Sequence, residues 1–207
     1  MITATPTFGS DIPDPDAETP DPLVLLGMWL PKNTDELKPL MTLATAEPDG
    51  TPDIRNVLLS EFDGENVYFH TDARSRKVDT LAANPRVALA LVWVEIGRQL
   101  TIQGVAQRAD TEQAQAAYAA RSRYLQLLAW RNDDELAQHP VGERRSDWAE
   151  FDAAHPEGSL TAPGHWLGFR VRPSRLTFWR GDPDGPSNRT EYRRGEDGSW
   201  AVRRLAG

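Results

Sequence analysis

The stretch that decides the fold is residues 41–71, MTLATAEPDGTPDIRNVLLSEFDGENVYFHT. Its β-branched and apolar runs predict strands over 41–46, 54–62 and 67–71. Between these runs, Glu47-Pro-Asp-Gly50 and Asp63-Gly64 are turn signals. Two hairpins in succession predict an antiparallel meander.

The segments after this meander are also predicted to be short strands, with one short helix. Residues 75–84 predict a short helix, with Ser75 as its N-cap and Asn84-Pro85 as its stop. Two more strands are predicted over 86–93 and 99–108. Five or six short strands with one brief helix favour a small closed barrel.

The rest of the chain adds helices and a second group of strands. Residues 111–130 are rich in Ala, Gln and Leu and predict the longest helix, and 131–165 are polar and loosely helical. Further strands are predicted at 166–172, 175–180, 191–194 and 200–205. Near the start, Asp21 and Pro22 predict the N-cap and first position of a helix over 23–30.

The N-terminal segment differs in composition from the rest. Residues 1–31 hold five acidic residues and no Lys or Arg. Up to residue 20, proline and acid leave little apolar surface to offset the entropy of ordering. We therefore expect a disordered acidic tail over 1–20 and a single domain over 21–207.

Composition excludes several classes of function. The 207 residues carry a formal net charge of −8, which argues against a nucleic-acid partner. The chain has no cysteine, so disulfides, thiolate catalysis and Cys-ligated metals are excluded. The four histidines have no metal-ligand spacing, and we expect no metal. Apolar runs stay below the roughly 20 residues of a membrane span, and we expect no membrane partner and a cytoplasmic location.

Cations at strand and helix ends give the positive signal. Arg55 lies in a predicted strand, and Arg76 and Lys77 lie at the predicted start of a helix. Cationic side chains normally avoid a helix N-terminus, because free N–H groups already give it a partial positive charge. A bound anion, most simply a phosphate, would account for them, and a pair of solvated surface charges is the alternative.

Aromatic residues give a second signal, since seven tryptophans occur in the chain. Their ordinary role is core packing, but a planar cofactor also needs such walls. Trp179 and Arg189 lie ten residues apart across a predicted turn, which would place a ring and a cation on neighbouring strands.

These segments, taken in order, resemble the pyridoxamine 5′-phosphate oxidase family of FMN-binding split barrels over about residues 21–206. The resemblance is carried by Arg55-Asn-Val-Leu-Leu59, Ser75-Arg-Lys77, Asn84-Pro-Arg-Val87, Trp93, Arg98-Gln99, Arg121 with Trp130, Trp166-x-Gly-Phe-Arg-Val-x-Pro173, Phe178-Trp179-x-Gly181 and the ending 200–206. It implies a mainly β fold with α-helices: a split β-barrel of antiparallel strands with peripheral helices and a C-terminal dimerisation region. It also implies a homodimer that binds FMN at the subunit interface.

The resemblance assigns a set of cofactor contacts to this chain. Arg55, Arg76 and Lys77 would hold the FMN phosphate, and Trp179 and Arg189 would complete the ring site. The full cofactor set is Arg55, Asn56, Val57, Leu58, His70, Thr71, Ser75, Arg76, Lys77, Gln99, Trp179 and Arg189.

The substrate side departs from the family pattern. A Lys that binds the substrate phosphate is replaced by Ser60, a Ser by Leu125, and a Tyr by Ala117, whereas Arg121 is retained. The Arg-Leu-His-Asp-Arg clamp reads Gly185-Pro-Ser-Asn-Arg189, so Ser187 replaces its His. The predicted substrate-binding residues are Ser60, Arg121, Leu125 and Ser187, and no catalytic residue is assigned.

This pattern predicts an FMN-dependent oxidase or dehydrogenase that passes a hydride to flavin N5 and is reoxidised by O₂. Its substrate would be a small ring or amine other than pyridoxine phosphate, as in biosynthesis of secondary metabolites. One alternative is a true pyridoxamine or pyridoxine 5′-phosphate oxidase that makes pyridoxal phosphate. Another is a non-catalytic protein that binds flavin, haem or deazaflavin, with His70 as an axial haem ligand.

Overall fold

The computed structural model describes residues 21–33 and 38–207, so the predicted acidic tail over 1–20 lies outside the described residues. The described chain forms two compact units. Unit 1 runs up to Phe69 and also includes Arg76–Arg108 and Phe169–Gly207, and unit 2 comprises His70–Ser75 and Ala109–Gly168. The expectation of one domain over 21–207 stays a prediction.

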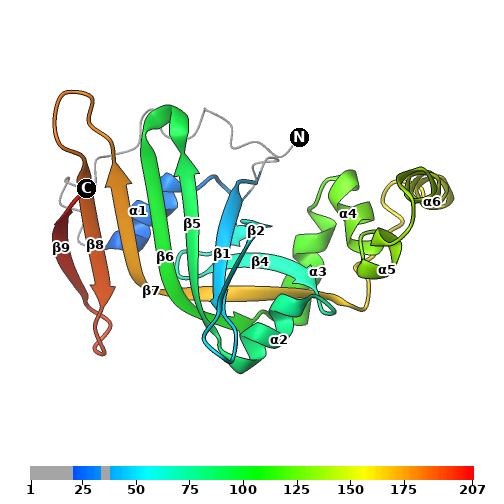
Figure 1. Cartoon of the computed structure of the whole chain (residues 1–207), viewed down its shortest axis with the longest axis horizontal. Helices are drawn as coiled ribbons and strands as arrows, with labels where there is room; N and C mark the ends of the chain where they lie inside the picture. The colour runs from blue at the N-terminus through cyan, green and yellow to red at the C-terminus, as the bar shows by residue number, and fades with distance from the viewer. Residues whose placement is uncertain (1–20, 34–37) are drawn as a thin grey trace. The chain divides into compact units, whose positions relative to one another are not determined.

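Most of unit 1 is a sheet, and the described chain has nine strands in it, ordered β2-β1-β5-β6-β7-β4-β3 with β8 on β7 and β9 on β8. The strands are β1 (Leu40–Ala46), β2 (Pro52–Leu58), β3 (Glu61–Phe62), β4 (Val67–Asp72), β5 (Arg86–Trp93), β6 (Arg98–Arg108), β7 (Trp166–Arg180), β8 (Asn188–Arg194) and β9 (Trp200–Ala206). Successive neighbours from β2 to β7, and then β8 and β9, pair antiparallel (Figure 1). This confirms the predicted mainly β fold of antiparallel strands with helices, and the strands form a half-barrel.

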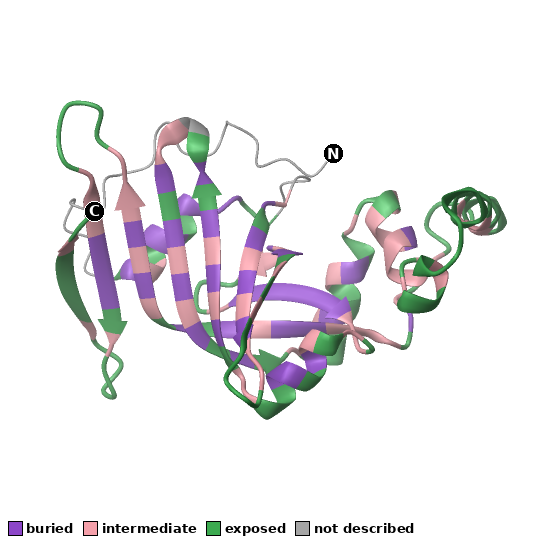
Figure 2. Ribbon diagram, in the orientation of Figure 1, coloured by how far each residue is buried: buried purple, intermediate pink, exposed green. Residues whose placement is uncertain are grey.

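The core of unit 1 follows from the alternation of side chains along its strands. Every second residue of β5 is buried, and Figure 2 shows the same banding along its neighbours. Helix α1 (Pro22–Trp29) covers this core, because Trp29 packs edge-on against Trp93 and Phe178, with ring centroids 6.0 and 5.1 Å apart. As predicted, Asp21 caps α1 by accepting a hydrogen bond from the Leu23 N–H.

Two short helical segments complete unit 1. Helix α2 (Arg76–Ala83) begins directly after Ser75, where the sequence predicts it, and buries Val78 and Leu81. The 3₁₀-helix η1 (Val94–Ile96) joins β5 to β6.

The strand predicted over 54–62 is wrong, because the structure has two strands there. The backbone changes partner at this point: the Leu59 N–H donates to Pro39 O, and the Ser60 N–H donates to Tyr68 O. Strand β2 therefore pairs with β1, and β3 pairs with β4.

The opposite error occurs at 166–180, where two predicted strands form the continuous β7. Pro173 lies within β7 opposite Gly104, where the β6–β7 register shifts. A proline has no N–H for the ladder, and the irregularity accommodates it. The Ser174 hydroxyl donates to Gln103 O beside it.

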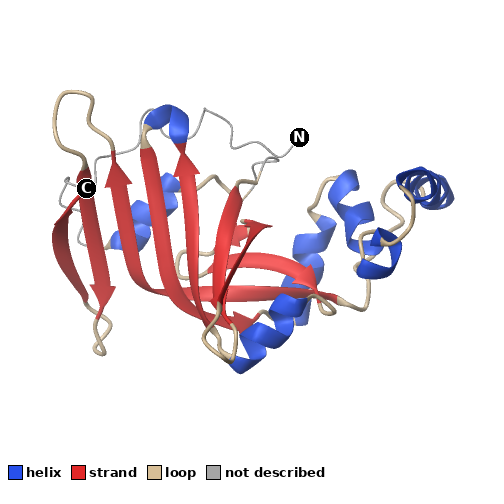
Figure 3. Cartoon of the chain, in the orientation of Figure 1, coloured by secondary structure: helices blue, strands red, loops and turns tan. Residues whose placement is uncertain are grey.

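Unit 2 is largely helical (Figure 3) and contains α3 (Thr111–Ala119), α4 (Arg123–Trp130), α5 (Asp134–Ala137) and α6 (Val141–Ala154). The single helix predicted over 111–130 is therefore wrong. The Tyr118 hydroxyl donates to Gln126 O, and the Gln126 amide donates to the carbonyls of Tyr118 and Ala119. These bonds satisfy the end of α3 and tie α4 to it across a turn that contains Arg121.

Candidate functional site

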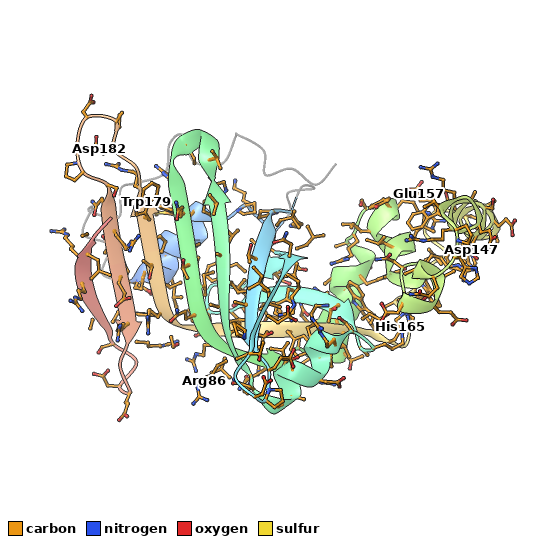
Figure 4. All side chains as sticks on the ribbon, viewed as in Figure 1. Arg86, Asp147, Glu157, His165, Trp179 and Asp182 are labelled. Atoms are coloured by element: carbon orange, nitrogen blue, oxygen red, sulfur yellow. The ribbon has the colours of Figure 1, made fainter. Side chains whose placement is uncertain are left out.

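A row of paired residues crosses β5 to β9 in unit 1. Gln99 on β6 lies opposite Trp179 on β7, and Trp179 lies opposite Arg189 on β8. Val92 and Leu205 extend the row at its two ends. Side chains directly opposite in a sheet share one face, so an amide, an indole and a guanidinium stand side by side. Trp179 lies near the C-terminal end of β7 (Figure 4).

Strand β2 divides its predicted cofactor residues between two faces. Arg55 and Val57 share a face with Asp53, since side chains alternate along a strand. Asn56 and Leu58 belong to the other face, where Asn56 Oδ1 accepts a hydrogen bond from the Thr42 hydroxyl. The structure therefore places Arg55 and Val57 on one face of the strand and Asn56 and Leu58 on the opposite face, so the four side chains do not gather at one site.

The Arg55 face carries a compact charge cluster. Asp53 Oδ2 lies 2.5 Å from Arg55 Nη2 and 2.6 Å from Arg76 Nη2, so one oxygen accepts from two guanidinium groups. Arg55 Nη1 donates to the hydroxyl of Thr45, a buried residue on β1, at 2.7 Å. Strand β2 and the first turn of α2 thus place two cations around one anion.

The exposure of these groups differs. The side chains of Asp53 and Arg55 are 23% and 18% exposed, whereas Arg76 is 76% exposed. Burial acts to raise the pKa of Asp53, but the hydrogen bond from Arg76 and the charges of both arginines outweigh it, so this pKa lies below its ordinary value. Lys77 follows in the first turn of α2 and is half-buried.

In unit 2 three side chains pack on one another. The buried His70 ring stacks on Trp166, with 5.3 Å between centroids and an interplanar angle of 3°. Arg121 Cζ lies 4.4 Å from the centroid of the same indole, a cation–π contact. His70 Nε2 lies 3.3 Å from Gln113 Oε1.

Burial lowers the pKa values of both His70 and Arg121. It lowers the pKa of His70 to about 4, helped by the positive charge of Arg121, so the imidazole is neutral at pH 7. Its Nε2 faces the side-chain amide of Gln113. Burial also lowers the pKa of Arg121 to about 10, and it remains a cation.

The surroundings of Arg121 are apolar and aromatic. Among residues 21–33 and 38–207, no acidic side chain pairs with Arg121. Tyr118, one residue from the family's tyrosine position, is buried and edge-on to Trp166, and its hydroxyl is engaged with Gln126 and Trp130. Leu125 is half-buried on α4 of the same unit. Of the other predicted substrate residues, Ser60 and Ser187 belong to unit 1.

The remaining predicted cofactor residues, Thr71 and Ser75, belong to unit 2, where β4 ends. The Ser75 N–H donates to Asp72 O, and Arg74 pairs with Asp72 at 2.7 Å and with Asp133 at 3.4 Å. Asp133 also caps α5 by accepting from the Leu136 N–H.

Within the described ranges, no helix has both the length and the apolar content to cross a membrane. Nor do the histidines and carboxylates described here form any group of three or more placed to hold a metal ion.

The described chain combines an antiparallel half-barrel, an arginine pair that meets at one carboxylate and a row that places a ring beside a cation. Residues 33–155 match the family model of pyridoxamine 5′-phosphate oxidase, and residues 166–207 match that of the pyridoxine 5′-phosphate oxidase C-terminal dimerisation region. The chain therefore belongs to the pyridoxamine 5′-phosphate oxidase family, whose members are generally oxidoreductases.

Individual relatives support this membership. Pyridoxine/pyridoxamine 5′-phosphate oxidase of Cupriavidus metallidurans is 35% identical over 192 residues, 90% of this chain and 89% of that protein. The protein of the same name from Salinibacter ruber is 36% identical over 200 residues, 92% of this chain and 91% of that protein.

Solved structures share the fold. PhzG from Burkholderia lata, in complex with tetrahydrophenazine-1-carboxylic acid, has a TM-score of 0.79 at 24% identity, over 95% of this chain and 98% of that one. A pyridoxamine 5′-phosphate oxidase-related, FMN-binding protein from Nostoc punctiforme has a TM-score of 0.65 at 19% identity, over 81% of this chain and 88% of that one.

Sequence reasoning missed two residues of these clusters. Asp53 lies two positions before Arg55, and in a strand that spacing puts both side chains on one face, so the ion pair was there to be found. Gln113 lies 43 positions from His70, and no local pattern joins the two.

Proposed function

We propose that this protein is an FMN-dependent oxidoreductase whose substrate is a small ring compound with a single negative charge. The observation that supports this most directly is the contrast between its two sets of cations. The residues assigned to the cofactor phosphate are retained, whereas Arg121 alone remains of the residues assigned to a substrate phosphate.

The donor set of unit 1 fits the FMN phosphate. The terminal nitrogens of Arg55 and Arg76 already converge on one oxygen, that of Asp53, and each donates a charge-assisted hydrogen bond to it. A phosphate oxygen presents the same acceptor chemistry. Lys77 adds a third cation in the same first turn of α2.

The row of Gln99, Trp179 and Arg189 fits the rest of the cofactor. An indole supplies a flat apolar wall, and an amide and a guanidinium supply hydrogen bonds to a polar ring edge. We propose that this row serves the cofactor in a homodimer, which agrees with the match of residues 166–207 to a dimerisation region.

The substrate side fits a monoanion better than a phosphate ester. A phosphate monoester carries nearly two negative charges, and each charge-assisted hydrogen bond to it contributes about 1.5–3 kcal/mol. With Ser60, Leu125 and Ser187 in place of a Lys, a Ser and a His, affinity for pyridoxine phosphate would fall by orders of magnitude. Within the part of the chain that the structure describes, no acidic side chain pairs with the partly buried Arg121, and one substrate carboxylate would balance its charge.

Trp166 and His70 would lie next to a carboxylate bound at Arg121. The indole packs against the His70 ring and the Arg121 guanidinium, so a ring carboxylate on Arg121 would lie beside aromatic side chains, and the neutral imidazole would add no charge. The ring carboxylate bound to PhzG is a compound of this kind, which makes it the first substrate class to test.

Bound FMN would supply the redox chemistry, by accepting a hydride at N5 and returning electrons to O₂. The protein's own part is to hold the phosphate, to orient the substrate by its charge on Arg121 and to keep water from the reacting ring.

A second candidate is pyridoxine/pyridoxamine 5′-phosphate oxidase itself. It is favoured by the names of relatives that are 35–36% identical over about nine-tenths of the chain. Under this hypothesis Arg121 and other groups would hold the substrate phosphate.

Flavin reduction without air separates the two candidates. Purified protein loaded with FMN is mixed anaerobically with pyridoxine 5′-phosphate, pyridoxamine 5′-phosphate or a partly reduced phenazine carboxylate, and bleaching near 450 nm is followed. We expect the ring carboxylate to reduce the flavin and the phosphate esters to do so at least a hundredfold more slowly. Fast reduction by a phosphate ester would establish the second candidate, and failure to bind FMN would remove both.

A further inference from the structure

Asp53 holds the position in unit 1 where an anion is expected. Its Oδ2 accepts from Arg55 at 2.5 Å and from Arg76 at 2.6 Å. These are two of the three cations that the proposed function assigns to the cofactor phosphate. A carboxylate of the chain itself therefore uses the donors that the phosphate would need.

The two arginines that contact Asp53 differ in their exposure and in their other contacts. Arg55 is held on its other side by the Thr45 hydroxyl, and its side chain is 18% exposed. Arg76 is 76% exposed, and Asp53 is the partner of its guanidinium. An incoming anion would therefore meet a fixed Arg55 and reach Arg76 from solvent.

The charges of these groups indicate that Asp53 weakens the binding of a second anion at the two arginines. Two guanidinium groups carry two positive charges, and Asp53 cancels one of them. The carboxylate is ionised at neutral pH, because the arginines hold its pKa below the ordinary value. A phosphate dianion at the same nitrogens would lie within a few ångströms of this carboxylate, and like charges at that distance repel.

We propose that Asp53 is an internal counter-anion that competes with the cofactor phosphate for Arg55 and Arg76, and so lowers the preference of this site for phosphorylated over unphosphorylated flavin. The inference rests on the proposed function. Binding of FMN exchanges one anion for another at Arg55 and Arg76, whereas riboflavin, which lacks the phosphate, leaves the Asp53 contacts in place.

The first test measures flavin affinity in the full chain. The Kd values of FMN and riboflavin are obtained from quenching of flavin fluorescence for the wild-type apoprotein and Asp53→Asn. We expect Asp53→Asn to bind FMN about tenfold more tightly and riboflavin equally well. Asp49→Asn is the matched control: it removes a charge from the neighbouring β1–β2 turn, where Asp49 accepts from the Thr51 N–H, and we expect its Kd values to stay within twofold of wild type.

If Asp53 assists phosphate binding, the change in FMN affinity has the opposite sign. If Asp53 orients the two arginines for the phosphate, Asp53→Asn will bind FMN more weakly, and that result, or an unchanged FMN affinity, overturns the proposal. Asp53→Ser repeats the measurement with a smaller neutral side chain, in case the amide retains the arginine contacts or the first variant folds poorly.

The second test needs no flavin. Thermal unfolding of the apoproteins is followed with and without inorganic phosphate at constant ionic strength. Without Asp53 the two arginines lack their anion, so we expect phosphate to raise the Tm of Asp53→Asn by several degrees more than that of wild type. Equal shifts would count against the proposal. Absence of FMN binding in every variant would remove the proposed function, while this phosphate comparison still decides whether Asp53 competes with an anion.

Discussion

Arg55 in unit 1 and Arg121 in unit 2 are both cations partly removed from water, but their charges are balanced in different ways. Arg55 shares the carboxylate of Asp53 with Arg76. Arg121 packs on an indole, and within the described chain no acidic side chain pairs with it. The first cluster already contains its anion, whereas the described residues supply no acidic side chain to the second. Under the proposed function, the cofactor phosphate would therefore displace a resident group, and the substrate's charge would not.

The largest effect is expected from removing cations of the Arg55 cluster. Arg55→Ala combined with Lys77→Ala deletes two proposed phosphate contacts, each worth about 1.5–3 kcal/mol, so the Kd of FMN should rise at least a hundredfold. The measurement is a fluorescence titration, with far-UV circular dichroism to verify folding. Arg86→Ala, an exposed cation at the start of β5 (Figure 4), is the control. An unchanged FMN affinity in the double variant would disprove the phosphate assignment.

Arg121 tests the other side of the comparison. In Arg121→Met we expect flavin reduction by a ring carboxylate to slow by about 10- to 100-fold, the loss of one charge-assisted contact, while the Kd of FMN stays the same. Because an unbalanced cation opposes burial, Tm should rise by about 2 °C.

The control for this prediction is Arg123→Met. Arg123 pairs with Asp152 at 2.6 Å and donates to the His155 carbonyl, so its loss should lower Tm. A fall in Tm for Arg121→Met equal to that of Arg123→Met would show that Arg121 is a structural residue.

The neutral His70 beside Arg121 predicts a pH dependence of stability. Its folded-state pKa is about 4, below the ordinary 6.5, so between these values the unfolded chain binds more protons and stability falls as pH is lowered. We expect wild type to lose up to about 3 kcal/mol in the free energy of unfolding from pH 6.5 to 4 through this group. His70→Gln should lose clearly less in urea titrations across that range.

Carboxylates affect the free energy of unfolding over a lower pH range than His70 does. Burial opposes the lowering of the Asp63 and Asp72 pKa values, but hydrogen bonds from Tyr68 and Arg74 prevail, so their contributions are lost mainly below pH 4. Identical acid limbs for wild type and His70→Gln would contradict the assignment of a buried neutral imidazole.

The smallest effect concerns the support of Arg55. Thr45→Val removes the hydroxyl that accepts from Arg55 Nη1 but keeps the size and shape of the buried side chain. A neutral acceptor is worth about 0.5–1.5 kcal/mol, so we expect the Kd of FMN to rise about threefold, with riboflavin unaffected. A larger rise for riboflavin than for FMN would place Thr45 in a different role.

The sequence predicted the fold where local patterns decide it. The hairpin around Asp63-Gly64, the Asp21 cap and the pairing of Trp179 with Arg189 follow from turn residues and strand spacing. It failed where a distant partner decides: at Leu59–Ser60, whose N–H groups bond to Pro39 and Tyr68, and at 120–122, where Gln126 closes α3.

The candidate site shows the same division. The cations Arg55 and Arg76 are visible in the sequence as members of one strand and one helix start, and the structure joins them through Asp53. The environment of Arg121 was not visible, because it depends on Trp166, 45 positions away, and on the absence of an acidic partner within the described ranges. Spacing reveals which residues share a face, but it does not reveal which charges remain unbalanced after folding.

The most direct test restores three residues of the family's substrate site: the Lys assigned to the substrate phosphate and the Arg and His of the clamp. Wild type and the triple variant Ser60→Lys, Gly185→Arg, Ser187→His are loaded with FMN, and the anaerobic rate of flavin reduction by pyridoxine 5′-phosphate is measured for each. We expect slow reduction in wild type and a rate at least a hundredfold higher in the triple variant, at equal FMN content. Fast reduction in wild type with no gain in the triple variant would contradict the claim that this chain keeps the cofactor site but not the phosphate-ester site.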